Sequence, residues 1–165
     1  MKSAKIAVLF GALSLVFMGC PYESKVPVDD SSNAKGDKAL VGKWEEKGDD
    51  SYEWKVTLDD NTYRIEKKNI KDGGDPTIYK GFLSDINGST FFNVWEKTDD
   101  GGDPKYYIYK LEKKGDDADR VKLKAMTDNI TEEFESSADL RTFIKKYMDL
   151  SFFWNKDDEK TYYKN

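Results

Sequence analysis

The side chains that could carry out chemistry in this chain are few in kind. Its 165 residues include one Cys and no His, which excludes a Ser-His-Asp or Cys-His catalytic set, a Cys/His zinc site and an intramolecular disulfide. Paired carboxylates could cleave glycosidic bonds if two acids stood about 5–10 Å apart. The sequence selects no such pair among its 32 acidic residues, because most lie in turn-like stretches such as Asp49-Asp50. We therefore expect no catalytic constellation and no enzyme.

The single cysteine, Cys20, has the clearest chemical assignment. Lys2 and Lys5 give the chain a positive start, residues 6–18 form an uncharged and largely apolar run, and Gly19 precedes the cysteine. This layout is typical of a secretory signal, and the run is too short to span a bilayer core of roughly 30 Å. The junction resembles the lipobox of bacterial lipoproteins, in which a signal peptidase cuts before a cysteine that has received a diacylglyceryl group.

The lipobox resemblance implies a signal peptide over residues 1–19 and a lipid anchor on Cys20. The covalent diacylglyceryl and N-acyl chains, palmitate among them, would be the only added group, with no other cofactor and no metal. Phe17 and Met18 depart from the family pattern, which prefers Leu and a small residue at these two places. Each buried CH₂ contributes about 0.8 kcal/mol, so two or three chains would hold the protein on a membrane. A buried thiol at the end of a core helix is the alternative.

The charge of the chain bears on its partners. Removal of the signal takes away Lys2 and Lys5 and leaves 25 basic against 32 acidic residues, a net charge of -7. Binding to nucleic acid depends on Lys and Arg neutralising phosphates, so no nucleic-acid partner is expected. The resemblance implies a location in the cell envelope, on the outer membrane, facing the periplasm or the surface.

Aromatic residues are the candidates for a binding site, since they make up 14% of the chain. They could line a cup for a small apolar or sugar ligand, or they could simply fill the core. A barrel of about eight strands is only just wide enough for its own side chains or one small ligand. The candidate lining residues are Tyr52, Trp54, Tyr63, Phe92, Trp95, Tyr107 and Tyr109.

The elements that would position these rings are short strands. Residues 52–58 alternate apolar and polar side chains with a period of two, and Asn87-Gly88 is the pair favoured in tight hairpin turns. About seven strands of this kind fit before residue 126, at the spacing of a meandering antiparallel sandwich or barrel. The alternating partners of the aromatic residues are Lys, Glu, Arg and Thr, so the outer face is wet and the domain is soluble rather than membrane-spanning.

A helix near the C-terminus completes the prediction. Leu140, Phe143, Ile144 and Tyr147 share one stripe, and Ser136 can cap its start. One or two final strands would follow over 150–154 and 160–164, around a turn at residues 157–158. Residues 20–38 contain Pro, Ser, Asn and Gly without apolar periodicity and predict a flexible tether, which leaves 39–165 as the β domain.

One short repeat invites a metal hypothesis. The sequence Asp-Gly-Gly-Asp-Pro occurs at residues 72–76 and again at 100–104. Two carboxylate loops could bind calcium, but the calcium-loop pattern with its later Glu is missing. Gly supplies positive φ, Asp caps a turn and Pro blocks strand pairing, so we interpret both copies as turns at one end of the meander.

Gly42-Lys43-Trp44, at the start of the first strand, resembles the Gly-x-Trp motif of lipocalins. The resemblance implies an up-and-down barrel or half-barrel of about eight strands, in which Gly42 and Trp44 are structural and the Trp closes one end. The Arg that packs on this Trp in the family has no counterpart that the sequence identifies. Small lipid-anchored lipocalin-like proteins of unknown role are common in Bacteroidetes-like genomes, and this chain looks like one of them.

The expected function follows from the anchor and the barrel together. We expect a membrane-anchored, non-catalytic binding module for a small apolar ligand or an envelope partner protein. The alternative is a structural envelope lipoprotein with a filled core and no ligand. A cavity larger than about 300 Å³ would favour the first interpretation.

Overall fold

A computed structural model describes residues 21–97, 101–115 and 118–165 of the chain. The expected signal peptide over 1–19 and the lipidation of Cys20 lie outside these residues. Within them the protein is mainly β, as the sequence predicts, with one long α-helix near the C-terminus.

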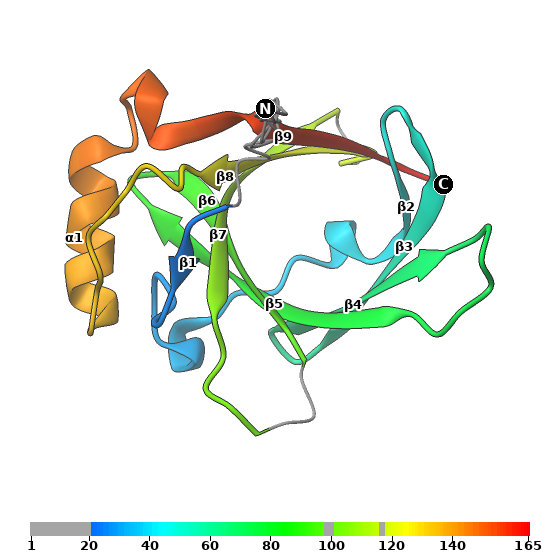
Figure 1. Cartoon of the computed structure of the whole chain (residues 1–165), viewed down its shortest axis with the longest axis horizontal. Coiled ribbons are helices and arrows are strands. Elements are labelled where there is room, and N and C mark those ends of the chain that lie inside the picture. The colour runs from blue at the N-terminus through cyan, green and yellow to red at the C-terminus, as the bar shows by residue number, and fades with distance from the viewer. Residues whose placement is uncertain (1–20, 98–100, 116–117) are drawn as a thin grey trace, which may run out of the picture.

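Eight antiparallel strands close into a barrel (Figure 1). Each strand pairs with its neighbours in sequence, and the last strand, β9, pairs with both β8 and β2, which completes the ring. The up-and-down barrel predicted from the alternating segments is therefore confirmed and is closed. Its strands are β2 (Gly42–Glu46), β3 (Asp49–Asp59), β4 (Thr62–Asn69), β5 (Thr77–Ile86), β6 (Ser89–Glu96), β7 (Tyr106–Lys114), β8 (Arg120–Met126) and β9 (Trp154–Lys164).

The final strand differs from its prediction. A turn was expected at Asp157-Asp158, but β9 continues through both residues as one strand. The pairing explains this, because β8 hydrogen-bonds to β9 on one side from residue 159 onward and β2 pairs with its last residues on the other. Strand formation in this segment depends on two neighbours distant in sequence, and local turn propensity is overridden.

The barrel wall has a core on each face. Alternate residues point inward, where buried Trp44, Tyr63 and Phe92 belong to one hydrophobic cluster. The neighbouring Phe91 points outward and joins a second cluster with Ile108. Helix α1 (Ser137–Tyr147) covers this outer face, as its place beside the barrel in Figure 1 shows.

Helix α1 begins and packs as its sequence predicts. Ser136 is the N-cap: its Oγ accepts a hydrogen bond from the Asp139 amide at 3.2 Å and donates one to the Asp139 carboxylate at 2.7 Å. Leu140 and Ile144 are fully buried against the outer face of the barrel. The helix therefore caps a second core instead of lining the barrel interior.

Residues 21–38, expected to form a flexible tether, instead pack along the barrel. Tyr22 and Val28 are buried in the outer core, and the short strand β1 (Glu23–Ser24) pairs with the start of β7. The Val28 amide donates to Asn93 Oδ1 at 2.7 Å, inside the core. A period of two in this segment indicates the packing, since the residues that turn inward are Tyr22, Ser24, Val26 and Val28. The Pro and Ser residues among them make the period hard to recognise in the sequence.

One end of the barrel is closed by a short 3₁₀ helix, η2 (Lys38–Leu40), and by Trp44. Trp44 Nε1 donates to the Leu40 carbonyl at 2.9 Å. Lys164 Nζ lies 5.6 Å from the centre of the Trp44 ring and donates to the Ala39 carbonyl at 3.0 Å. At Gly42, where φ is +146°, an added Cβ would lie 2.7 Å from Lys164 Cε. Gly42 and Trp44 therefore pack together with Lys164 at this end of the barrel, and the Lys164 ammonium lies over the Trp44 ring.

The opposite end of the barrel is open. The connections β2–β3, β4–β5, β6–β7 and β8–β9 lie there, because strands alternate in direction around the ring. The first copy of the Asp-Gly-Gly-Asp-Pro repeat falls in the β4–β5 connection, and residues 101–104 of the second fall in the β6–β7 connection at the same end; Asp100 lies outside the described residues.

Candidate functional site

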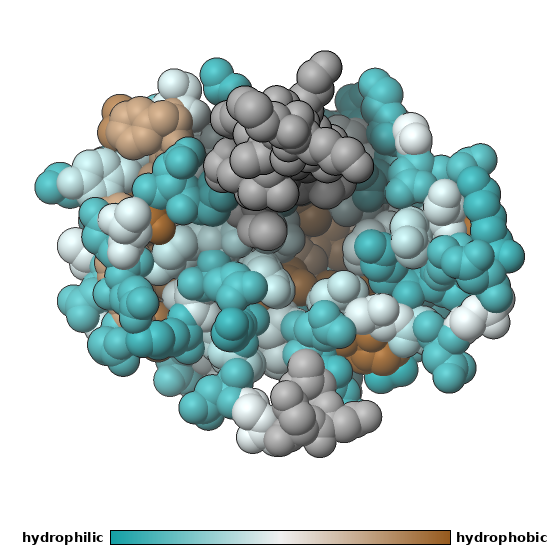
Figure 2. Space-filling model, in the orientation of Figure 1, coloured by the Kyte–Doolittle hydropathy of each residue, from teal (hydrophilic) through white to brown (hydrophobic). Residues whose placement is uncertain are grey.

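The barrel encloses a cavity of about 480 Å³. Figure 2 shows it as a hollow in the face of the molecule, with hydrophobic residues visible at its floor. All eight strands contribute inward-facing side chains, so the cavity lies within the ring. The lining residues are Pro21, Leu40, Trp44, Glu46, Asp49, Trp54, Val56, Ile65, Lys67, Tyr79, Phe92, Val94, Glu96, Tyr107, Tyr109, Leu111, Val121, Leu123, Asp158, Lys160 and Tyr162.

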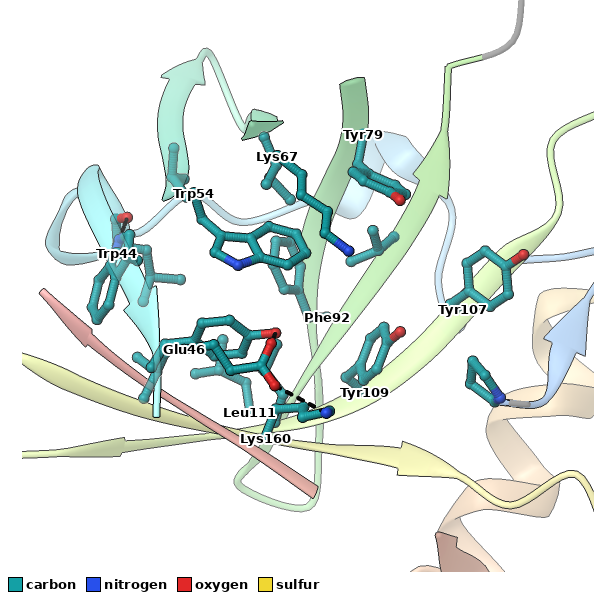
Figure 3. Close-up of a pocket in the computed structure, with 18 of the residues that line it drawn as sticks. Trp44, Glu46, Trp54, Lys67, Tyr79, Phe92, Tyr107, Tyr109, Leu111 and Lys160 are labelled. Carbon is teal, nitrogen blue, oxygen red and sulfur yellow. Dashed lines mark hydrogen bonds and ion pairs between the residues drawn. The ribbon is translucent and has the colours of Figure 1, made fainter. Parts of the chain in front are cut away.

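The lining changes from apolar to polar between floor and mouth. Near the closed end, Leu40, Val56 and Ile65 are among the side chains that form the floor. Toward the open end the same strands present tyrosine hydroxyls and charged groups, of which Tyr79 and Tyr107 are labelled in Figure 3. A cavity of this kind suits a ligand with an apolar body and one polar end.

A partly buried ion pair lies on one wall, where the Lys160 side chain is 42% exposed. Lys160 Nζ is 2.9 Å from Glu46 Oε1, and the Glu46 side chain is only 14% exposed (Figure 3). The Tyr162 hydroxyl donates to Glu46 Oε2 at the long distance of 3.5 Å. Burial raises the pKa of Tyr162 well above its ordinary value, so this phenol stays protonated. The pair neutralises itself and leaves the wall without net charge at this point.

Burial also shifts two further groups beside this pair. Desolvation raises the pKa of Tyr109, which remains a neutral hydroxyl. Desolvation likewise raises the pKa of the Asp158 carboxyl, against the opposing effect of nearby Lys160. Both shifts favour the neutral form of these groups on the wall formed by β7 and β9.

Lys67 is the basic side chain of the opposite wall. Its Nζ lies 4.2 Å from the centre of the Tyr52 ring and 5.0 Å from that of Trp54. Among the residues that the structure describes, no carboxylate forms an ion pair with it. Figure 3 shows the side chain reaching into the cavity beside Trp54. An ammonium held by aromatic faces and free of a carboxylate is available to a ligand acceptor.

Trp54 contributes a ring face to the site, and its indole N–H is an unpaired donor among the described residues. Its Nε1 is buried and has no hydrogen-bond partner within the described part of the chain. Its ring meets Tyr162 in an edge-to-face arrangement with centres 5.6 Å apart. This contact passes over β2, which lies between β3 and β9 in the sheet.

Four of the seven aromatic residues proposed from the sequence line the cavity together. These are Trp54, Phe92, Tyr107 and Tyr109.

The other three lie elsewhere. Tyr63 lies inside the barrel beneath the cavity and is fully buried: it packs edge-on against Phe92, and its hydroxyl donates to the Asp37 carbonyl at 3.0 Å. Burial raises the pKa of Tyr63 to about 12. Tyr52 lies beside Lys67 but outside the set of lining residues. Trp95 lies on the outer face, packed against Phe82 and Tyr106, so the expectation that it faces the cavity is corrected.

Sequence reasoning missed the charged residues of the cavity. Glu46, Lys67 and Lys160 each lie at an inward-facing position of their strand. Their charge alone predicts that such side chains face solvent. The signal was present in β4, where Lys67 is two residues beyond Ile65 and four beyond Tyr63. Strict alternation, carried through the charged residue, places it on the inner face.

Two other kinds of feature, metal-binding clusters and membrane-spanning helices, are absent from the described residues. In the described ranges no group of three or more His, Cys, Asp or Glu side chains is arranged to hold a metal ion. No helix within these ranges has the length and apolar character needed to cross a membrane.

Comparison of the chain with protein-family models, with curated proteins and with solved structures finds no match. The fold and the cavity therefore carry the functional argument.

Proposed function

We propose that this protein is a membrane-anchored lipoprotein of the cell envelope whose barrel binds a small, largely apolar ligand. The lipid on Cys20 would locate the protein, and the cavity would hold the ligand. The lipocalin-like build belongs to the same proposal, supported by the closed up-and-down barrel and by the Trp44–Lys164 contact at its closed end.

The single observation that carries the proposal is the cavity of about 480 Å³ within the barrel. Pockets for small ligands typically measure roughly 300–1,000 Å³ and are lined by apolar and aromatic side chains with a few polar groups. A barrel of eight strands can be filled completely by its own residues. The space left here favours a binding module over a structural lipoprotein with a packed interior.

The chemistry of the wall favours an amphiphile with a hydrogen-bond acceptor at its polar end. The floor offers aliphatic and aromatic contact, while Lys67 provides an ammonium at the level of Trp54. The opposite wall supplies a hydroxyl donor from Tyr109, whose pKa is raised by burial. No nucleophile with an adjacent base is assembled among the described lining residues, and we therefore propose binding without catalysis.

The fluorescence of Trp54 and Trp95, which lie inside and outside the cavity, tests the proposal. Titration with 1-anilinonaphthalene-8-sulfonate, an anionic amphiphile that fluoresces in apolar sites, should quench tryptophan emission and saturate at one equivalent. Trp54→Phe should reduce this quenching, since Trp54 lines the cavity together with Trp44, whereas Trp95→Phe should leave it unchanged, since Trp95 lies outside.

Absence of saturable binding, or equal responses of the two variants, would refute a cavity ligand and favour the structural alternative. Native mass spectrometry of protein from its own host would then decide whether an endogenous small molecule co-purifies. An envelope protein recovered in its place would support the partner interpretation.

A further inference from the structure

The N-terminal end of the described chain lies at the mouth of the cavity. Pro21 is one of the lining residues, and the Tyr22 amide donates to the Met126 carbonyl at 3.1 Å, at the open end of β8. The next two residues form β1, which pairs with Tyr106 and Tyr107 at the open end of β7. The chain is therefore fixed to the rim of the barrel from its first described residues.

This attachment leaves no spacer between the anchor and the barrel. Cys20 precedes Pro21 directly, and consecutive Cα atoms are about 3.8 Å apart. Tyr22 is only 8% exposed, and its hydroxyl donates to the Glu132 carbonyl at 2.7 Å, which holds the segment in place. A lipid on Cys20 would thus leave the protein at the rim of the open end.

The large apolar side chains that remain exposed point to the same end. Ile70, 56% exposed, belongs to the β4–β5 connection, which lies at the open end. Leu150 and Phe152, 41% and 69% exposed, precede Trp154, which pairs with Met126 at the end of β8. Exposed apolar groups beside an anchoring point suit the interface between headgroups and acyl chains.

We propose that the open end of the barrel faces the bilayer, so that the cavity exchanges its ligand with the amphiphiles of that membrane. This inference rests on the lipid anchor of the proposed function. The cavity mouth, the attachment point and three of the four large exposed apolar residues in the described chain share one end. The closed end, with η2 and Lys164, faces away from the membrane.

Contact quenching from labelled lipids tests the orientation. The full chain, lipidated in a bacterial host, is inserted into phosphatidylcholine vesicles that contain a lipid with a nitroxide on its headgroup. A bimane fluorophore is attached through Gly74→Cys at the open end or through Asn61→Cys at the closed end. Gly74 has open space around an added Cβ and no positive φ, and Asn61 is exposed in the β3–β4 turn. The thiol of Cys20 is blocked by its lipid, so each variant has one reactive cysteine.

We expect at least threefold stronger quenching at position 74 than at position 61. Equal quenching, or stronger quenching at 61, overturns the proposal. A Gly/Ser linker of 20 residues inserted between Cys20 and Pro21 has a mean reach of about 25 Å and should bring the ratio close to one. A ratio that persists with the linker still supports the orientation and assigns it to the exposed apolar residues.

The same samples separate this inference from the proposed function. Protein that does not float with the vesicles lacks its anchor, and both are then overturned. Protein that floats and binds the anionic fluorophore, yet shows equal quenching at the two positions, overturns the orientation alone.

Discussion

Asn93 offers a decisive perturbation, because one buried amide ties the N-terminal segment to the barrel. Its side chain is fully buried on the outer face of β6. Oδ1 accepts from the Val28 amide at 2.7 Å, and Nδ2 donates to Ser84 Oγ at 2.9 Å and to the Phe82 carbonyl at 3.3 Å. Asn93→Leu keeps the approximate volume of the side chain and removes all three hydrogen bonds.

The expected loss can be worked from these contacts. An unpaired buried N–H at Val28 costs about 1–3 kcal/mol, and each of the other two hydrogen bonds contributes about 1 kcal/mol. The added apolar surface of Leu offsets part of this, so the free energy of unfolding should fall by about 3 kcal/mol. With an m-value of roughly 2 kcal/mol per molar urea, the unfolding midpoint should fall by about 1.5 M.

Urea unfolding followed by tryptophan fluorescence measures this shift. Lys35→Ala is the matched control: it removes an exposed ion pair with Asp85 from the same N-terminal segment, and it should change the free energy of unfolding by less than about 0.5 kcal/mol. Hydrogen exchange at the Val28 amide should accelerate strongly in Asn93→Leu. A midpoint within about 0.3 M of the parent protein, or a Val28 amide that stays protected, would refute our account of the segment.

Three further predictions concern the barrel and its cavity. Lys164→Met should lower the free energy of unfolding by about 2 kcal/mol in urea denaturation, because it removes both the contact with the Trp44 ring and the hydrogen bond to Ala39; an unchanged midpoint would contradict the closing role of this lysine. Val94→Trp should fill the cavity and weaken binding of the anionic fluorophore at least tenfold with an unchanged circular dichroism spectrum; binding at parental affinity would place the ligand elsewhere. Burial raises the pKa of Asp158 above its ordinary 3.8, so this group favours the folded state increasingly as the pH falls through its raised folded pKa and loses that contribution as the pH rises. The stability of the parent relative to Asp158→Asn should therefore increase from pH 7 to pH 4 in parallel urea titrations, and a constant difference would show that the carboxyl is not buried in the folded protein.

Alternation was sufficient to predict the barrel, because strands such as β3 and β4 have one face toward solvent and one toward the interior. Residues 52–58 and the Asn87-Gly88 turn have the periods and turn residues that antiparallel strands require. Alternation could not predict the second core, since β6 is apolar on both faces: Phe91 packs outward and Phe92 inward. Such a strand gives no sign of which ring faces the cavity, and for that reason Trp95 was misplaced.

The N-terminal segment shows the other limit of sequence reasoning. Its Pro, Ser and Asn residues suit a linker, and its apolar residues are too few to form an element by themselves. Val28 is ordered by Asn93, 65 residues away in the sequence, and Tyr22 by Met126 and Glu132. Whether a polar segment packs depends on contacts with residues distant in the sequence, and the composition of the segment does not reveal these contacts. The same holds for β9, where β8 pairs at Trp154 and again from Glu159 onward, on either side of the expected turn.

The barrel closes only when its final strand, β9, pairs with β2. β9 joins β2 across almost the whole chain: Asn165 and Glu45, which are hydrogen-bonded, are 120 positions apart. Until β9 has been synthesised, the edges of β2 and β8 that face each other have no partner, and the ring cannot close. Contacts so distant in sequence also slow the search for the native state, to milliseconds or seconds in comparable β proteins.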